Sequence, residues 1–362
     1  MMQKISFCTS SMNRAHHIKQ TLKKNILDNV EYGNLEFVLL DYGSSDGLEN
    51  YIQLELQEFI DSGILKYFRI KDVQFFNPSH SRNISFKVSN GNLLCNVDAD
   101  NFLGKGFATF INNNFMQHPN CFLSAMHSDS DVLGRICVKR SDFFKLKGFD
   151  ERMIGYGFED FDLIYRLEAS GLRNIDIKDL NFLKIIKHSN SERILNKKIR
   201  HTIRQLLVRQ VNYYSSELFF LLDHGYMEYG TIMDNVAICA TNCVLAEMNQ
   251  KPLYEYSLLE QEWQAGNWTQ SGTMLHLSLS GDKTILLNDH LQFYNCQKSH
   301  SYFKVCSGTE LMEEGLFFYN QLTNRSKMQT NKSRNPEDVN PTGYGEGIVF
   351  KNFNYQYPIN LK

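Results

Sequence analysis

The chain has 362 residues, of which 42% are apolar and 13% aromatic, and its formal net charge at pH 7 is -2. This length suits one large folded domain or two ordinary ones, and the nearly neutral charge argues against a nucleic-acid partner. The eight cysteines lack the paired spacing of a zinc site, so we expect reduced thiols in a cytoplasmic protein. No charged and apolar leader begins the chain, and no apolar run approaches the roughly 18 residues of a membrane span. We therefore expect neither export nor a transmembrane segment.

Strand and helix patterns alternate along the first half of the chain. The expected strands are Ile5–Cys8, Leu35–Leu40, Leu65–Ile70 and Asn92–Val97, and the expected helices are Ala15–Asn29, Leu48–Ile60 and Ser81–Val88. Such alternation predicts right-handed βαβ units and an α/β fold with a mostly parallel sheet. Loops that follow the strands then gather at one edge of the sheet, where α/β proteins bind their ligands.

A buried strand that ends in two acidic residues is the first chemical signal. The apolar run Asn92–Val97 leads directly into Asp98-Ala99-Asp100. Two carboxylates one residue apart at a sheet edge suit a hard cation such as Mg²⁺ or Mn²⁺, whose remaining positions substrate phosphates can fill. An isolated Asp-x-Asp pattern more often begins a surface loop, so the metal-site interpretation depends on the other motifs.

Two further segments suit a nucleotide. Asp41 ends the second strand, and the Gly- and Ser-rich turn behind it either lets a nucleobase approach closely or only caps the next helix. Arg82 lies in the helix before the strand of Asp98 and can face a phosphate, although an arginine on a helix is usually solvated. Neither segment identifies a site by itself.

The segment Gly155-Tyr156-Gly157-Phe158-Glu159-Asp160 is the second strong signal. Acidic residues in the first turn of a helix favour its dipole, but that does not explain the glycines and the aromatic residue before them. A carboxylate at this position could orient a sugar hydroxyl and accept its proton. Farther on, His188 follows an expected strand and could complete a metal site, although a lone histidine is more often structural.

In combination, these motifs resemble those of a family-2-type glycosyltransferase of the GT-A fold. They are Cys8-Thr9-Ser10-Ser11-Met12-Asn13-Arg14, Asp41-Tyr42-Gly43-Ser44-Ser45-Asp46-Gly47, Asp98-Ala99-Asp100 and Gly155-Tyr156-Gly157-Phe158-Glu159-Asp160, in that order. The last is most similar to the C-terminal segment of β-1,4-galactosyltransferases and bacterial chondroitin-type polymerases. The resemblance implies a nucleotide-sugar donor, with a UDP-sugar favoured, a divalent cation and an inverting displacement at the anomeric carbon.

The resemblance also implies which residues bind the donor. Thr9 and Asp41 would contact the nucleobase, and Arg82 would lie on the pyrophosphate side. Arg14 is assigned to the donor with them. Asp98 would contact the nucleotide ribose or the metal.

For the metal and the chemistry, the resemblance implies a second group of residues. Asp98 and Asp100 would hold Mn²⁺ or Mg²⁺, with His188 as a further ligand. Glu159 would hold the acceptor, and Asp160 would be the base that deprotonates its attacking hydroxyl. Retaining relatives carry Glu-Asn where this chain has Glu159-Asp160, which favours inversion.

The character of the sequence changes after His188. Ile194–Leu222 predicts one long amphipathic helix, which packs on its own domain or lies on a membrane that bears a lipid-linked acceptor. The region that follows is strand-rich, and Thr273–Leu279 with Thr284–Leu287 predicts a hairpin.

We therefore expect a GT-A catalytic domain over residues 1–193, a helical and β-rich accessory or inserted region over residues 194–318, and a polar tail over residues 319–362. The tail either returns to the catalytic domain or forms a mobile surface segment.

The sequence thus predicts a metal-dependent inverting glycosyltransferase that moves a sugar from a nucleotide-sugar donor to a hydroxyl of a glycan or lipid-linked glycan, as in bacterial surface polysaccharide synthesis. It would be cytoplasmic, with peripheral contact at the inner face of the membrane allowed. The first alternative is a non-catalytic carbohydrate- or nucleotide-sugar-binding protein on the same scaffold, which would not need carboxylates for both a metal and a base. The second is a nucleotidyltransferase, whose Gly-rich, basic phosphate loop is absent from the sequence near its N-terminus.

Overall fold

The chain is divided into two compact units. The computed structural model describes residues 2–126, 132–212, 215–233, 264–279, 284–288, 303–305 and 310–362. The first unit comprises Met1–His188 and Lys327–Lys362, and the second comprises Ser189–Ser326. The boundary between Ser326 and Lys327 falls inside one helix, α12 (Glu310–Lys332).

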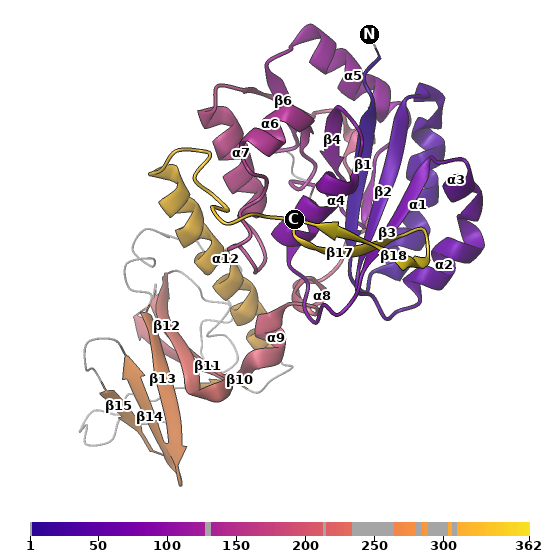
Figure 1. The fold of residues 1–362 in the computed structure, drawn as a ribbon. Helices are drawn as coiled ribbons and strands as arrows, with labels where there is room; N and C mark the ends of the chain where they lie inside the picture. Colours follow the sequence, from indigo (N-terminus) through magenta and orange to yellow (C-terminus); the bar gives the residue numbers. More distant parts are fainter. Residues whose placement is uncertain are drawn as a thin grey trace. The chain divides into compact units, whose positions relative to one another are not determined.

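A nine-stranded sheet organises the described part of the first unit (Figure 1), in the order β18-β17-β3-β2-β1-β4-β7-β6-β8. Its strands are β1 (Ile5–Ser11), β2 (Leu35–Tyr42), β3 (Leu65–Ile70), β4 (Leu93–Asn96), β6 (Cys121–Ser124), β7 (Cys137–Lys139), β8 (Arg173–Asp176), β17 (Gly347–Lys351) and β18 (Asn354–Leu361). Strands β3, β2, β1 and β4 are parallel neighbours, whereas β7 and β17 run antiparallel to β4 and β3. The predicted α/β fold with a mostly parallel central sheet is confirmed.

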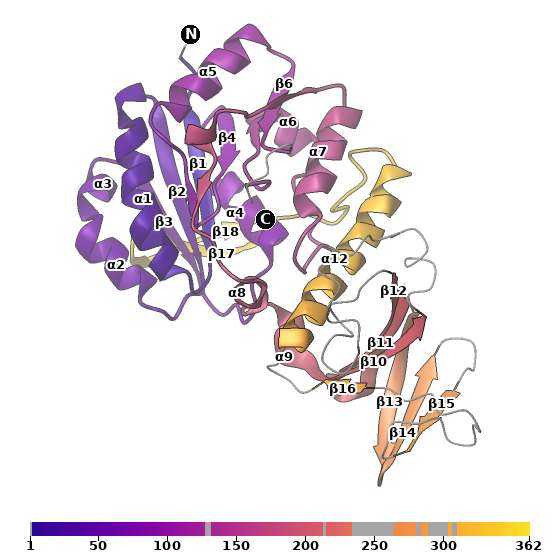
Figure 2. The ribbon, with the colours of Figure 1, turned by 180° about the vertical axis from the view of Figure 1, so that it is seen from behind.

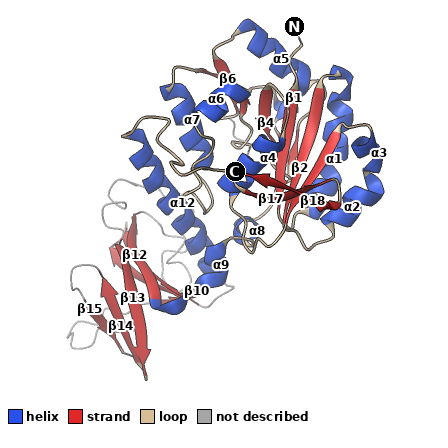
Figure 3. Ribbon diagram, in the orientation of Figure 1, coloured by secondary structure: helices blue, strands red, loops and turns tan. Residues whose placement is uncertain are grey.

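Helices cover both faces of this sheet (Figures 2 and 3). They are α1 (Ala15–Asn29), α2 (Leu48–Glu55), α3 (Gln57–Asp61), α4 (Pro78–Val88), α5 (Phe107–Gln117), α6 (Arg140–Lys145) and α7 (Glu159–Ala169). The bounds predicted for α1 and β3 are confirmed. The helix predicted over Leu48–Ile60 is in fact two helices, because buried Leu56 takes a non-helical conformation between α2 and α3.

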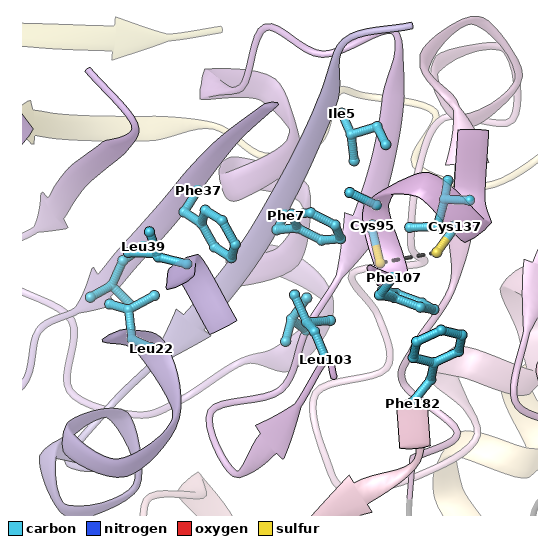
Figure 4. Packing of buried hydrophobic residues seen from close by; sticks show 14 of the residues in the cluster. Ile5, Phe7, Leu22, Phe37, Leu39, Cys95, Leu103, Phe107, Cys137 and Phe182 are labelled. Carbon is cyan, nitrogen blue, oxygen red and sulfur yellow. Dashed lines mark hydrogen bonds between the residues drawn. The ribbon is translucent and has the colours of Figure 1, made fainter. Parts of the chain in front are cut away.

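Alternate residues of the central strands supply two separate cores. Phe7 packs with Phe37 and residues of α1 and α5 on one face, and Figure 4 shows this cluster around Phe7 and Phe107. Cys8, the next residue along β1, packs on the other face with residues of α4, α6 and α7. Because successive side chains of a strand point to opposite faces, continuous apolar strands are what a sheet covered on both sides requires.

The second unit contradicts the helix predicted over Ile194–Leu222. That segment forms two short helices, α8 (Asn190–Ile194) and α9 (Lys198–Thr202), and two antiparallel strands, β10 (Ile203–Asn212) and β11 (Ser215–Leu222). Consecutive residues are buried in both strands, Leu206 to Val208 and Leu218 to Leu221. A short run that is buried on all sides has no periodicity that separates a strand from a helix. In this segment the two runs form an antiparallel β-hairpin and not a helix.

These strands belong to a seven-stranded sheet in the order β15-β14-β13-β12-β11-β10-β16. Its other strands are β12 (Tyr226–Met233), β13 (Gln264–Ser271), β14 (Met274–Leu279), β15 (Thr284–Leu287) and β16 (Phe303–Val305). The predicted hairpin is confirmed, since β14 pairs antiparallel with β15, while its turn lies outside the described residues.

The expected polar tail begins inside α12. Buried positions of this helix include Leu316, Asn320, Asn324, Met328 and Asn331, which recur every three or four residues. The period is helical, but asparagines occupy three of these positions, so the apolar pattern that would predict a helix is missing. After α12 the chain returns to the sheet, where β17 pairs with β3 and β18 pairs with β17.

Candidate active site

The carboxyl ends of β1, β2 and β4 lie together because β1 is the parallel neighbour of both other strands. Asp41 is the register partner of Ser11 on β1, and Asn96 at the end of β4 is the partner of Cys8. Behind Asn96, the turn Asp98–Asn101 is closed by a hydrogen bond from Asn101 N–H to the Asp98 carbonyl at 3.0 Å. The predicted acidic motif is therefore a tight turn at this edge of the sheet.

Arg82 lies at the centre of a cluster with three carboxylates, which we call the Arg82 cluster (Arg82, Asp98, Glu159 and Asp160). Its Nη1 donates to Asp160 at 2.9 Å and to Glu159 at 3.2 Å, and its Nη2 donates to Asp98 at 3.0 Å. The Arg82, Glu159 and Asp160 side chains are buried, at 10%, 6% and 12% exposed, whereas Asp98 is 33% exposed. One edge of the cluster is thus open to a ligand.

Local structure explains the position of Arg82. Helix α4 begins with Pro78, and the side chain of Asn77 caps it by accepting the His80 N–H at 3.1 Å. One turn into the helix, the Arg82 guanidinium stacks over the Phe149 ring at 5.4 Å. A Cβ at Gly134 would lie 2.4 Å from Asp98 Oδ2, so any larger residue at this position would displace the Asp98 carboxylate from its place in the cluster.

The charges of the cluster are unbalanced, because one guanidinium faces three carboxylates. Burial, together with the negative charges of Glu159 and Asp98, raises the pKa of Asp160 to about 7, although Arg82 acts to lower it. Burial opposes the charged form of Arg82, but the three carboxylates raise its pKa overall. Glu159 Oε2 is buried and has no hydrogen-bond partner. A buried carboxylate oxygen without a partner is uncommon and marks a place where a ligand can donate.

Asp100 and His188 form a second pair beside this cluster. His188 Nε2 lies 2.9 Å from Asp100 Oδ2, and both side chains are 13% exposed. They meet because β5 (Asn101–Phe102) pairs with β9 (Lys184–Ile185), and the Ile186 N–H donates to the Asp100 carbonyl at 2.8 Å. Burial acts to raise the pKa of Asp100, but the hydrogen bond with His188 holds it below its usual value.

These side chains fit a divalent cation. An imidazole nitrogen and a carboxylate oxygen already converge to 2.9 Å, and Asp98 lies on the same turn as Asp100. Carboxylate and imidazole ligands suit Mn²⁺ and other divalent cations. The other oxygen of Asp100 accepts a hydrogen bond from Asn101 Nδ2 at 3.0 Å, which leaves Oδ2 directed at His188.

The residues predicted to bind the nucleobase lie elsewhere on the same edge. Strand β1 extends to Ser11, so Thr9 is a buried strand residue, 6% exposed, and not part of the loop. Arg14 precedes α1, and its carbonyl accepts the His17 and Ile18 N–H groups. The roles of Thr9 and Arg14 toward the donor stay predictions.

Asp41 belongs to a second group, the Arg69 cluster (Arg69, Asp41, Glu49 and Tyr67). Asp41 is fully buried and accepts hydrogen bonds from Tyr67 at 2.7 Å, from Arg69 at 3.0 Å and from the Ser44 N–H at 2.7 Å. Arg69 also bonds Glu49 at 2.7 Å. Burial raises the pKa of Asp41, although these partners act to lower it. Its role toward a nucleobase stays a prediction.

Sequence reasoning missed the asparagines that hold the acidic turn. Asn96 donates to Asp98 at 3.1 Å and to the Gly134 carbonyl at 2.8 Å. Asn101, on the other side of the motif, is held by fully buried Arg135 at 2.9 Å and in turn bonds Asp100. The available signal was their position in the sequence, within two residues of Asp98 and Asp100.

A family model described as the N-terminal domain of galactosyltransferase matches residues 118–191. This match confirms the predicted resemblance to glycosyltransferases over a segment that includes Glu159, Asp160 and His188. No curated protein matches the chain in sequence. In the described part of the chain, no helix has the length and apolar character needed to cross a membrane.

Solved glycosyltransferase structures are similar at low identity. A mannosyltransferase from Pyrobaculum calidifontis, in complex with GDP-Man and Mn²⁺, is 19% identical with a TM-score of 0.42, over 50% of this chain and 56% of that one. TarS from S. aureus with UDP is 15% identical with a TM-score of 0.41, over 49% and 58%. The catalytic domain of Drosophila β1,4-galactosyltransferase 7 with xylobiose is 14% identical with a TM-score of 0.37, over 54% and 75%.

The likeness thus covers little more than half of the first two proteins. At these TM-scores, it assigns no role to any residue of this chain. The sequence match is the firmer link: the segment that contains Glu159, Asp160 and His188 is galactosyltransferase-like.

Proposed function

We propose that the chain is a metal-dependent glycosyltransferase of the GT-A fold, which transfers a sugar from a nucleotide-sugar, with a UDP-sugar favoured, to a hydroxyl of a glycan or lipid-linked glycan. The observation that supports this most is the Arg82 cluster beside the Asp100–His188 pair. It combines a site for a divalent cation, a cation for phosphate and a carboxylate with a pKa near 7. The galactosyltransferase match over residues 118–191 supports the same reaction class.

Asp98, Asp100 and His188 would hold Mn²⁺ or Mg²⁺. When bound, such a cation stabilises negative charge on the departing nucleoside diphosphate. Arg82 would supply further positive charge to the same phosphates, because its Nη2 hydrogen-bonds to Asp98, the most exposed side chain of the cluster.

Asp160 would act as general base. A carboxyl with a pKa of about 7 is half ionised at neutral pH and can accept a proton from an acceptor hydroxyl. The acceptor oxygen would bond to the anomeric carbon as the bond from that carbon to the β-phosphate oxygen breaks, and Asp160 would take the hydroxyl proton. A direct displacement of this kind inverts the anomeric centre. Glu159, with its unpartnered Oε2, would orient the acceptor.

The first unit would carry this chemistry, since every residue assigned to it lies in Met1–His188. We propose that the second unit is an accessory module inserted before the C-terminal return of the chain. An acceptor carried on a lipid would require peripheral contact with a membrane.

Hydrolysis of UDP-, GDP- and CMP-sugars by the full chain tests the proposal, with Mn²⁺, with Mg²⁺ and with a chelator. We expect hydrolysis of one class of donor that requires the cation and disappears in Asp100→Ala. If no nucleotide-sugar is bound or hydrolysed under any of these conditions, the transferase proposal is wrong and a binding function becomes the better account.

A further inference from the structure

Arg135 is a fully buried arginine that is bonded to the end of the acidic turn. Its exposed fraction is 0%, and its Nη2 donates to Asn101 Oδ1 at 2.9 Å and to the Phe102 carbonyl at 3.1 Å. Its Nε and Nη1 have no hydrogen-bond partner, and in the described part of the chain no carboxylate forms an ion pair with it. A buried guanidinium with unsatisfied donors lowers the stability of the folded state.

A second buried arginine shows how such a residue is usually satisfied. Arg166 is also 0% exposed, and its Nε donates to the Asp162 carboxylate at 2.8 Å. Its Nη1 donates to the Leu146 carbonyl at 2.9 Å, and its Nη2 donates to the Gly148 carbonyl at 2.7 Å. All three nitrogens therefore have partners. A role in holding the fold together explains Arg166, but it does not explain the two unpartnered nitrogens of Arg135.

Arg135 determines which way the side-chain amide of Asn101 faces. A guanidinium can only donate hydrogen bonds, so the amide oxygen of Asn101 must face it. The amide nitrogen then faces the acidic turn, where it donates to Asp100 Oδ1 at 3.0 Å. A reversed amide would place two acceptor oxygens against each other. With Oδ1 held in this way, Asp100 Oδ2 is the oxygen that lies 2.9 Å from His188 Nε2.

We infer that Arg135 is a positioning residue for the proposed metal site, because it acts through Asn101 to hold Asp100 with Oδ2 directed at the cation. This inference rests on the proposed function, since it concerns the cation of that same site. The positive charge of Arg135 would by itself repel a divalent cation. Removing Arg135 therefore has opposite effects on cation binding in the two cases: it weakens binding if the hydrogen bonds dominate and tightens it if the charge dominates.

The test measures Mn²⁺ binding to the full chain by the paramagnetic resonance signal of the free ion, and urea unfolding without metal. Arg135→Met replaces the guanidinium with an unbranched apolar side chain. We expect its Mn²⁺ affinity to fall about tenfold, the lower end of the loss when a metal ligand is no longer held by its hydrogen-bond partner. Its urea midpoint should stay level or rise, because a buried charge with unsatisfied donors is removed.

Arg166→Met is the matched control, because it removes an equally buried guanidinium that has no bond to the acidic turn. Its urea midpoint should fall, since Asp162 loses its partner, whereas the folded protein should bind Mn²⁺ as wild type does. The two variants thus have opposite expected patterns. A lower midpoint and unchanged Mn²⁺ affinity in Arg135→Met would match the control and give Arg135 a purely structural role.

A double-mutant cycle with Asn101→Ala tests the route. Asn101→Ala alone should weaken Mn²⁺ binding about tenfold, and adding Arg135→Met to it should change the affinity by less than about twofold. Losses that multiply would show that Arg135 does not act through Asn101, which would refute the inference. If Arg135→Met does not fold, Asn101→Ala carries the test, and an unchanged Mn²⁺ affinity in that variant refutes the inference as well.

The remaining outcomes separate this inference from the proposed function. If Arg135→Met binds Mn²⁺ as tightly as wild type or more tightly, the positioning role is wrong, while the proposed metal site stands. If wild type binds no Mn²⁺, the metal site itself is refuted and the inference falls with it.

Discussion

The Arg69 and Arg82 clusters lie at the same edge of one sheet and differ in how well their carboxylates are satisfied. In the Arg69 cluster, fully buried Asp41 accepts hydrogen bonds on both of its oxygens. In the Arg82 cluster, three carboxylates share one guanidinium, and Glu159 Oε2 has no partner. Buried charges whose hydrogen bonds are all satisfied usually hold the fold together. A cluster with excess negative charge and an unsatisfied carboxylate oxygen is instead typical of a site that binds a cation and a substrate. The predictions below separate these two roles.

The largest expected effect is on turnover in Asp160→Asn. Asparagine keeps the size of the side chain but cannot accept the acceptor proton, so transfer should fall about 10²–10⁴-fold. Donor affinity should change little, because the proposed function assigns Asp160 to the acceptor and not to the donor. Steady-state transfer rates and calorimetric titration with UDP and Mn²⁺ measure the two quantities. Equal losses of rate and of UDP affinity would contradict the assignment.

Asp100→Ala should weaken Mn²⁺ binding by about 100-fold or more, since the loss of an outer-sphere partner alone can approach that figure. The binding of Mn²⁺ is measured by the paramagnetic resonance signal of the free ion. Asp61→Ala, which removes an exposed carboxylate, is the control and should bind Mn²⁺ as wild type does. Unchanged Mn²⁺ affinity in Asp100→Ala would place the metal elsewhere.

Asp41→Ala should act mainly on stability. It leaves Arg69, Tyr67 and the Ser44 N–H without their buried acceptor, so the free energy of unfolding should fall by about 3 kcal/mol. Asp160→Asn should change it by less than about 1 kcal/mol, because it removes a repelling charge along with an attracting one. Urea denaturation compares the two variants. A larger loss of unfolding free energy in Asp160→Asn than in Asp41→Ala would contradict the different roles assigned to the two clusters.

The smallest expected effect concerns pH. Burial and the neighbouring carboxylates raise the pKa of Asp160 to about 7, and the base must be deprotonated to act. The rate of transfer should therefore rise with pH, by up to tenfold per pH unit below about pH 7, and level off above it. The measurement is kcat/KM for the acceptor across this range. A rate that falls as the pH rises toward 7 would exclude Asp160 as the base.

The sequence predicted the first half of the fold well, because apolar strands and one-sided helices alternate there with turn residues between them. It predicted the acidic turn and the start of α7 for the same reason, since each follows a recognisable element. It could not show that Arg82 joins Asp98 to Glu159 and Asp160, because these contacts span up to 78 positions and depend on packing.

Elsewhere, the physical signals were ambiguous or absent. Leu206 to Val208 and Leu218 to Leu221 are buried on consecutive positions, which suits a helix or a strand equally from sequence. In α12, Asn331 is buried because it bonds Asp150 and Asp162, each at 2.8 Å. A polar residue buried by specific hydrogen bonds looks like a surface residue in the sequence, so the helix was not predicted.

The most direct test of the central claim is the position of the metal. Crystals of the full chain grown with UDP and Mn²⁺ would locate the ion by anomalous scattering. The proposed function predicts one strong peak within coordination distance of Asp100 and His188, with the UDP phosphates on its other side. A nucleotide bound with no peak at this pair, or an ion bound away from the Arg82 cluster, would contradict the claim that this cluster is the active site.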